Sequence, residues 1–501
     1  PGSKQVSVNV DGNELKIVRT WALSKYREQK VSASSAFIYD KNPNLQQQSD
    51  GTSRISISLK KGEKFSFALL GSVCTGRDFI DPYNESDREV IYGAKEGLNR
   101  LMNGHRKLWN ELWEGDIMIE GDDEAQRAVR FALYNLYSNA RKGSRLSISP
   151  FGLSAQGYNG HIFWDTEFWM YPPMLFMNQG IARTMMDYRT DRLEAACQRA
   201  LSYGYDGAMF PWESDDAGEE SCPTWALTGT FEHHITADIA IAAWNYYCMS
   251  GDKRWLREEG FPLMEKVAEF WVSRVEKNED GSYSIRNVVC ADEYAEGVDD
   301  NAFTNGAAMR ALQDAAKAAV VCGVKAPAIW KEIASKLRLP KFENGVTMEY
   351  EGYNGQTIKQ ADANLLVYPL NLITRPEEIR KDLEYYEDKI DKTGPAMSFS
   401  VLALQYARLG EGDKAYDLFV QSFRPNQLPP FGVISEGAGG TNPYFVTGAG
   451  GLLQTVINGF CGLEVTDNGI KQLFSKLPKH WKKLTITGVG PDRKTYVRMQ
   501  K

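Results

Sequence analysis

Residues 251–275, GDKRWLREEGFPLMEKVAEFWVSRV, decide the fold class of this chain. The apolar residues of the stretch recur at threes and fours, which predicts the buried stripe of an amphipathic helix. These residues are Leu263, Val267, Phe270, Trp271 and Val275. Gly251 stands where a preceding helix should end, and the charged turn after it should start the next one. This order is typical of stacked helical hairpins.

A second junction, GDKAYDL at 412–418, resembles the first. The first follows a predicted helix with Ile235, Ile239 and Trp244, and the second follows one with Val401, Leu404 and Ala407. Helix pairs of this kind are expected from about Asp123 to Thr447. Such repetition fits either an open solenoid or a closed toroid of helices, and the sequence period does not choose between them.

Both flanks of the helical region have other patterns. Residues 5–80 hold short β-branched runs between turn signals, which predicts antiparallel sheet. Helical spacing begins near Ser86 and predicts a helical linker, with leucines at 98, 101, 108 and 112. The last forty residues, with LEVTDNGIKQLF and KKLTITGVG, predict a small β appendage.

The composition is that of an ordinary globular protein, with 25% charged and 43% hydrophobic residues. The net charge of −7, without a long basic run, argues against nucleic acid as a partner. No run of 18 apolar residues is present, so no membrane span is expected. The seven cysteines are odd in number and scattered, and they are interpreted mainly as buried thiols.

The chain starts at Pro1 without Met, which suggests that an upstream piece was processed away, cut or left out, and a signal peptide could have been lost with it. On this interpretation a periplasmic or secreted location is favoured over the cytoplasm.

Aromatic and acidic residues gather in five predicted loops. The loops are 157–169, 209–222, 290–305, 353–369 and 431–451. Sugar chemistry needs this mixture, because carboxylates and amides bind hydroxyls, aromatic faces pack on C–H surfaces, and two carboxyl groups cleave the bond. Any single carboxylate there has a plainer interpretation as a helix cap or ion-pair partner.

Four strings strongly resemble glycoside hydrolase family 65 and occur in that family's order: HIFWDTE, ADEYAEGVDDNAFTN, IKQADANLLVYP and GAGGLLQTVINGFCGL. The resemblance covers about residue 105 to the end. It implies a mainly α fold, an (α/α)6 barrel catalytic domain with an N-terminal β-sandwich portion and a small C-terminal β-sheet. The expected divisions are 1–84 for the sandwich portion, 85–122 for a helical linker, 123–460 for the barrel and 461–501 for the sheet. The sandwich portion is well short of the family's usual size.

The resemblance places the family's general acid, the Glu of the DEY string, at Glu293. This carboxyl would protonate the glycosidic oxygen, and burial or a neighbouring acid such as Asp292 would keep it protonated near neutral pH. The alternatives are a salt-bridged loop acid at this position and Glu296 as the acid.

The C-terminal loop decides between hydrolysis and phosphorolysis in this family. It offers Glu436, 143 positions after Glu293 (436 − 293), and no Lys, Arg or His between Ile434 and Gly451. A phosphate anion would find no cation in it. The resemblance therefore implies that Glu436 is the general base of an inverting hydrolase, with the carboxyl groups about 6.5–9.5 Å apart. A carboxylate satisfied by backbone amides of the Gly-rich turn is the plainer alternative.

The family's sugar-binding pattern maps onto Trp164 and Asp165 and onto Lys359 and Gln360. Asp165 would accept from sugar hydroxyls, Lys359 and Gln360 would donate, and Trp164 would pack on the ring. Each of the four has a plainer alternative as a core or structural polar residue. Trp212 and Glu213 are further candidates for substrate binding.

His233 and His234 are adjacent and should face different sides of a helix, so they are interpreted as structural or substrate-side histidines. No catalytic metal and no organic cofactor are expected.

The predicted substrate is a small α-glucoside. Kojibiose, trehalose, nigerose, maltose and glucosylated galactosyl-hydroxylysine all fit the family, and the look of the C-terminal loop favours the α-1,2 bond of kojibiose. A disaccharide phosphorylase and a sugar-binding toroid without activity are the other readings, and the retention of both Glu293 and Glu436 argues against the second. A homodimer is one oligomeric state that the sequence leaves open.

Overall fold

The computed structural model describes residues 2–11, 13–23, 29–47, 53–154 and 157–500. Gly12, in one of the turns expected within residues 5–80, lies outside these residues. The chain divides into two compact units, Pro1–Trp113 and Glu114–Lys501.

The first unit contains the antiparallel sheet that residues 5–80 predict. Four strands pair in the order β1 (Gly2–Val10), β2 (Asn13–Leu23), β3 (Lys30–Tyr39) and β6 (Phe67–Thr75). A hairpin of β4 (Asn44–Gln47) and β5 (Ser53–Ser56) is separate from this sheet. Two helices follow, α1 (Pro82–Glu96) and α2 (Leu98–Leu112).

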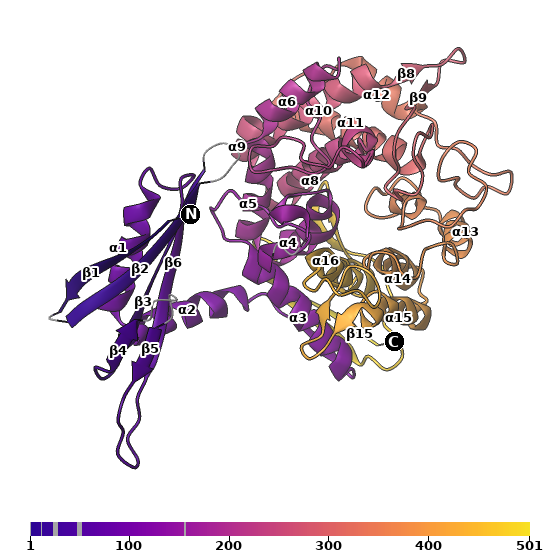
Figure 1. The fold of residues 1–501 in the computed structure, drawn as a ribbon. Coiled ribbons are helices and arrows are strands. Elements are labelled where there is room, and N and C mark those ends of the chain that lie inside the picture. Colours follow the sequence, from indigo (N-terminus) through magenta and orange to yellow (C-terminus); the bar gives the residue numbers. More distant parts are fainter. Residues whose placement is uncertain (1, 12, 24–28, 48–52, 155–156, 501) are drawn as a thin grey trace. The chain divides into compact units, whose positions relative to one another are not determined.

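Helix α1 lies against one face of the sheet rather than serving only as a connection (Figure 1). It begins with Pro82 at its first position, and the Asp81 carboxylate accepts from the Asn84 backbone N–H. Val90 of the helix joins a small core with Leu15 and Ile17 of β2. The expected linker span therefore includes a helix that is part of the sheet's own core.

The second unit is mainly helical. Its helices are α3 (Asp123–Asn139), α4 (Tyr171–Met177), α5 (Gln179–Thr190), α6 (Leu193–Ser202), α7 (Thr228–Phe231), α8 (His234–Ser250), α9 (Lys253–Trp255), α10 (Phe261–Arg274), α11 (Ala302–Cys322), α12 (Ala328–Lys336), α13 (Pro376–Tyr386), α14 (Ser398–Arg408), α15 (Gly412–Gln421) and α16 (Val446–Gln454). Short pairs of strands lie between them, β8 (Glu276–Lys277) with β9 (Tyr283–Ser284) and β10 (Gln427–Leu428) with β11 (Val433–Ile434). Helix makes up 45% of the structure, so the expectation of a mainly α chain with sheets is confirmed.

The stretch 251–275 folds as its pattern predicts. Gly251 ends α8 in the left-handed conformation at φ 65°, and the Asp252 carboxylate accepts from the Trp255 backbone N–H at 2.9 Å. The stripe residues from Leu263 to Trp271 are buried on α10. Val275 is the exception, because it lies half-buried just beyond the end of the helix.

The second junction differs from the first. The turn between α14 and α15 is made by Gly410, at φ 88°, while Gly412 is already the first residue of α15. A Cβ on Gly412 would come within 2.2 Å of the Leu477 carbonyl oxygen. This glycine therefore permits a close approach of two backbones rather than ending a helix.

Buried helices form the middle of the second unit. All nine residues of α16 are buried, as are ten of the eleven residues of α14. Helix α11 packs against α8, α10 and α12, and α14 packs against α15 (Figure 1). The loops that carry the predicted site residues connect these buried helices to their neighbours.

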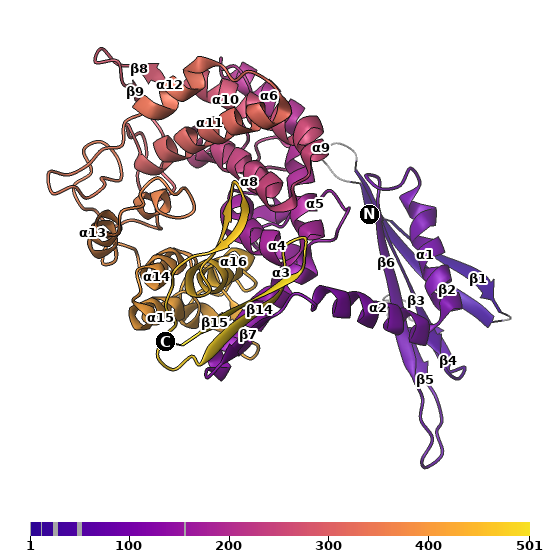
Figure 2. The same cartoon turned by 180° about the vertical axis from the view of Figure 1, so that it is seen from behind.

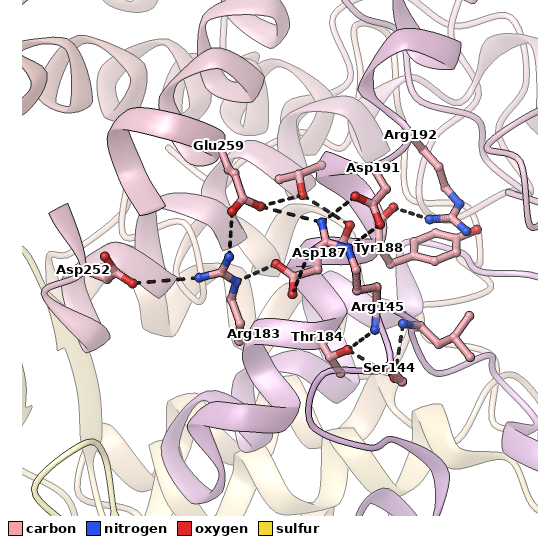
Figure 3. A network of polar contacts seen from close by, with 12 residues as sticks. Ser144, Arg145, Arg183, Thr184, Asp187, Tyr188, Asp191, Arg192, Asp252 and Glu259 are labelled. Carbon is pink, nitrogen blue, oxygen red and sulfur yellow. Dashed lines mark hydrogen bonds and ion pairs between the residues drawn. The ribbon is translucent and has the colours of Figure 1, made fainter. Parts of the chain in front are cut away.

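A polar network ties α5 to the segments around it (Figure 3). Arg183 donates to Asp187 in its own helix and to Glu259 at 2.7 Å, and Arg145 donates to Asp191 at 2.7 Å. Arg145 also lies 3.9 Å from Glu259, which joins both arginines into one network. Networks fix geometry better than isolated surface pairs do, so this one holds α5 against the turn Leu256–Gly260.

The last part of the chain forms two antiparallel pieces. β12 (Leu463–Thr466) pairs with β13 (Gly469–Gln472), and β14 (Lys483–Val489) pairs with β15 (Lys494–Met499). β14 also pairs with β7 (Ile117–Glu120), a strand from the start of the unit that lies beside it in Figure 2. The predicted C-terminal strands are thus confirmed, and the linker span contributes one strand to their sheet.

All seven cysteines are free; three are buried and four are half-buried. In the described part of the chain, none of the helices is both long and apolar enough to cross a membrane.

Candidate active site

A pocket of about 390 Å³ in the second unit brings most of the predicted site residues together. Of those residues it is lined by Trp164, Asp165, Trp212, Glu293, Lys359, Gln360 and Glu436. They come from all five predicted loops, which are far apart in the sequence. The remaining lining residues are Tyr158, Phe163, Pro395, Met397 and Phe445.

Glu213 is the predicted site residue that does not line this pocket. Its buried carboxylate contacts His161 Nδ1 at 2.6 Å, and this hydrogen bond raises the pKa of His161. Its backbone N–H donates to Glu220 at 2.9 Å. Glu213 therefore follows a lining residue, Trp212, in the chain, while its own carboxylate contacts His161.

Glu293 lies in the pocket in an unusual backbone conformation. Its φ of 58° is in the left-handed region, which a non-glycine residue adopts only when its surroundings enforce it. The Lys359 ammonium donates to Glu293 Oε2 at 2.8 Å, and the Gln360 amide donates to Oε1 at 3.2 Å. Both oxygens are thus oriented by the KQAD string.

The loop around Glu293 is tied to that string by backbone contacts as well. The Glu293 N–H donates to the Cys290 carbonyl at 2.9 Å, which closes a tight turn. The Lys359 backbone N–H donates to the Asp292 carboxylate, and the Gln360 amide also donates to the Ala291 carbonyl. Burial raises the pKa of Asp292 to about 6. The two strings therefore form one hydrogen-bonded unit.

Glu436 is held by two neutral side chains. The Tyr158 hydroxyl donates to Oε1 at 2.7 Å, and the Asn442 amide donates to Oε2 at 2.9 Å. Its backbone carbonyl accepts from the Ala396 N–H at 3.0 Å, which connects its loop to that of Pro395 and Met397. Side chains, rather than the backbone amides of the Gly-rich turn, are thus the donors seen on this carboxylate in the described residues.

Tyr158 is a site residue that the sequence interpretation missed. It belongs to the turn Tyr158–Gly160, in which all three residues have positive φ. Its ring stacks on Phe151 at 5.7 Å and meets the edge of Phe163 at 5.0 Å. Burial, followed by the charge of Glu436, raises the pKa of Tyr158, so the phenol remains a donor. The sequence offered one signal for Tyr158, its position just before the string HIFWDTE in a predicted site loop.

Trp164 and Asp165 form the floor of the pocket. Trp164 is buried and packs edge-on against His234 at 4.9 Å, with Phe303 at 6.0 Å. Burial, followed by the charge of Glu436, raises the pKa of Asp165 to about 8. Such a carboxyl is easily kept neutral until a partner binds it.

The two histidines are engaged in internal hydrogen bonds. His234 contacts Asp238 at 2.7 Å and Glu232 at 2.8 Å. Burial disfavours its charge, but Asp238 and Glu232 outweigh burial and raise the pKa of His234 to about 10. His233 contacts the Thr230 carbonyl at 2.8 Å, and burial lowers its pKa to about 3. Both histidines have structural partners, as the sequence interpretation expects.

One group of potential metal ligands lies behind the pocket in the described residues. Cys290, Glu349 and Asp362 are all buried, and their ligand atoms lie within 4.8 Å of one another. A larger cavity of about 580 Å³ lies elsewhere in the unit, lined by Glu167, Asp238 and others, but neither Glu293 nor Glu436 lines it.

The sequence matches one family of known enzymes. The profile of the "Glycosyl hydrolase family 65 central catalytic domain" matches residues 130–356. A kojibiose hydrolase of Flavobacterium johnsoniae is 54% identical over 93% of this chain and 70% of the relative. The chain belongs to glycoside hydrolase family 65. The resemblance of the four strings is thereby confirmed, and this family 65 chain is a glycoside hydrolase.

Two further comparisons support the assignment to family 65. A kojibiose hydrolase of Mucilaginibacter mallensis is 48% identical over 97% of this chain and 74% of the relative. A solved structure named for a kojibiose phosphorylase of the human microbiome superimposes with a TM-score of 0.76. It is 17% identical and covers 97% of this chain and 79% of that chain, so it shows the fold alone.

Proposed function

We propose that this chain hydrolyses the α-1,2-glucosidic bond of kojibiose with inversion of configuration. The observation that carries the proposal is the pair of carboxylates, Glu293 and Glu436, which line one pocket from separate loops. Hydrolysis of an α-glucosidic bond agrees with the family. The choice of kojibiose is supported by the names of the two bacterial relatives.

In the proposed reaction Glu293 is the general acid and Glu436 the general base. Glu293 protonates the glycosidic oxygen as the bond to the anomeric carbon breaks. Glu436 removes a proton from a water that attacks this carbon from the opposite face, which gives β-glucose. The carboxyl groups should be about 6.5–9.5 Å apart to admit the water.

The other pocket residues are proposed to bind the glucose unit that is released. Asp165 accepts from a sugar hydroxyl, and Lys359 and Gln360 donate to others. Trp164 packs on the ring, where an aromatic face suits the apolar C–H surface. Trp212, which lines the pocket, is a further candidate for substrate binding. Glu213 is a weaker one, because it lies outside the lining and contacts His161.

Hydrolysis is favoured over phosphorolysis by the charges around Glu436. Tyr158 and Asn442, both neutral, contact this carboxylate. The cation in the pocket lining, Lys359, contacts Glu293 instead. A phosphate dianion beside Glu436 would meet a like charge without a cationic partner. A phosphorylase is the second candidate because a kojibiose phosphorylase of Thermoanaerobacter brockii is 32% identical over 80% of this chain and 58% of that protein.

We also propose that the helices of the second unit form an (α/α)6 barrel, with α8, α11, α14 and α16 among the inner helices. Their extensive burial and the similarity to a family fold support this. The sandwich portion at 1–84 and the boundaries of the linker, barrel and C-terminal sheet stay predictions.

A panel of α-linked glucose disaccharides tests the proposal. Kojibiose should be cleaved faster than nigerose, maltose and trehalose, at the same rate with and without inorganic phosphate. Cleavage that needs phosphate and yields glucose 1-phosphate would replace the proposal by the phosphorylase. Faster cleavage of another linkage would keep the proposed hydrolysis but replace kojibiose as the substrate.

A further inference from the structure

One short turn, residues 391–396, lies between α13 and α14 and reaches the pocket, which its Pro395 lines. The Asp391 carboxylate holds the turn together, because it accepts from the Thr393 backbone N–H and from the Thr393 hydroxyl, both at 2.8 Å. The Gly394 N–H closes the turn by donating to the Asp391 carbonyl at 3.1 Å. The 391–396 turn is thus a unit with its own hydrogen bonds.

The first half of this turn contacts the segments that hold Glu293. The Asp391 N–H donates to the Ile358 carbonyl at 2.8 Å. The Tyr294 hydroxyl donates to the Asp391 carboxylate at 2.9 Å, and Tyr294 directly follows Glu293 in the chain. Ile358 directly precedes Lys359, whose ammonium donates to Glu293. The turn is therefore bound to both strings that fix the proposed acid.

The second half of the turn contacts the loop of the proposed base. The Ala396 N–H donates to the Glu436 carbonyl at 3.0 Å, and Pro395 forms an antiparallel bridge with Gly437. A Cβ on Gly437 would come within 2.9 Å of the Thr393 carbonyl oxygen. The backbone of the base loop thus packs directly on the turn.

Gly394 permits the closest approach of the turn to the KQAD string. A Cβ on Gly394 would lie 2.4 Å from the Lys359 carbonyl oxygen. The φ of Gly394 is outside the left-handed region, so the close contact and not the backbone conformation requires glycine. A methyl group at this position must push the turn and the Lys359 backbone apart. Since the base loop is bound to the other side of the turn, Glu436 should move away from Glu293.

We propose that the 391–396 turn is the spacer that sets the separation of the two carboxyls, with Gly394 and Asp391 as its positioning residues. An inverting hydrolase needs about 6.5–9.5 Å between them to admit one water. A misplacement of about 1 Å can lower the rate about 10²-fold. The proposal rests on the proposed function for the roles of Glu293 and Glu436.

Gly394→Ala tests the spacer. Its kcat on kojibiose should fall about 10- to 100-fold, with most of the loss in kcat rather than KM. The attack of water is common to kojibiose and α-glucosyl fluoride, so the loss should be similar on both substrates. A crystal structure of the variant should show the carboxyls of Glu293 and Glu436 further apart than in wild type. An unchanged separation, or full activity despite a larger one, would overturn the proposal.

Gly412→Ala is the matched control. Its Cβ would lie 2.2 Å from the Leu477 carbonyl oxygen, its φ is also outside the left-handed region, and in the described part of the chain Gly412 does not line the pocket. This variant should have a lower Tm and an unchanged kcat per folded molecule. An equal loss of kcat in both glycine variants would show that the effect is general destabilisation.

Asp391→Ala tests the turn if Gly394→Ala does not fold. It removes the acceptor that holds Tyr294 and Thr393, and its kcat should fall about fivefold on both substrates. An unchanged kcat would contradict the positioning role of Asp391. Full activity of Glu293→Gln or Glu436→Gln would instead overturn the proposed function, while the separation in the crystal structure would still report on the spacer.

Discussion

The loops that carry Glu293 and Glu436 hold their carboxylates by different means. Glu293 has a positive φ, a cationic donor in Lys359, and buried acids behind it. Glu436 has two neutral donors, Tyr158 and Asn442, in a loop without Lys, Arg or His. One carboxylate is thus part of a charged network, and the other is held by polar groups of no charge.

This difference bears on the proposed roles of the two carboxyls. An ammonium beside Glu293 stabilises negative charge, whereas a general acid must hold a proton. The proposed subsite resolves the conflict, because Lys359 would donate to a sugar hydroxyl once glucose is bound.

The largest expected effect separates the two carboxyls by leaving group. Glu293→Gln and Glu436→Gln should each lower kcat on kojibiose by about 10²–10⁴-fold. With α-glucosyl fluoride, whose leaving group needs little protonation, Glu293→Gln should recover most of its activity and Glu436→Gln should not. Initial rates on both substrates measure this.

Glu296→Gln is the matched control for this pair, because Glu296 is exposed in the same loop as Glu293. It should retain full activity on both substrates. Full activity of Glu293→Gln on kojibiose would show that Glu293 is not the acid. Recovery of Glu436→Gln alone on the fluoride would reverse the two proposed roles.

The next effect concerns the cation at Glu293. Lys359→Met removes the charged donor and should lower kcat/KM about 10- to 100-fold, because a hydrogen bond to a charged group is lost at the sugar. Steady-state kinetics on kojibiose measure it. Lys266→Met, which removes a surface lysine paired with Glu269, serves as the control and should change nothing. An unchanged kcat/KM in Lys359→Met would show that Lys359 does not bind substrate.

A smaller effect is expected at the neutral donors of Glu436. Tyr158→Phe keeps the ring that stacks on Phe151 and removes only the hydroxyl. Its kcat should fall about tenfold with a small change in KM, since one hydrogen bond that orients the base is lost. Tyr203→Phe, at a half-exposed tyrosine after α6, is the control. A change confined to KM would mean that Tyr158 binds sugar instead of orienting Glu436.

The smallest effect is on stability. The pKa of Asp165 is raised from 3.8 to about 8, so between these values the folded state binds more protons than the unfolded state. The free energy of unfolding from this group is therefore greatest at low pH and falls as pH rises towards 8. Asp165→Asn cannot titrate, so its Tm should fall less than that of wild type between about pH 6 and pH 8.5.

Glu258→Gln is the control for this measurement, because Glu258 is an exposed acid paired with Arg254 on the surface. It should follow the wild-type dependence of Tm on pH. An Asp165→Asn curve parallel to wild type would show that Asp165 does not carry the proton.

The sequence predicts those parts of the site that depend on local pattern. The spacing from Leu263 to Trp271 predicts a buried helix face. The resemblance of the KQAD and FWDTE strings to family 65, rather than any spacing, predicts residues that line the pocket. Tyr158 was missed because its position depends on a turn of left-handed residues, which no periodicity reveals.

The most direct test of the central claim is the anomer that kojibiose hydrolysis releases first. Proton NMR during the initial minutes, in phosphate-free buffer, distinguishes newly formed β-glucose from α-glucose before mutarotation mixes them. Glucose from the cleaved end should appear as the β anomer, which is the inverted product of water activated by Glu436. An initial excess of α-glucose over what the reducing-end glucose of kojibiose contributes would contradict the assignment of Glu436 as the base, and the mechanism built on it.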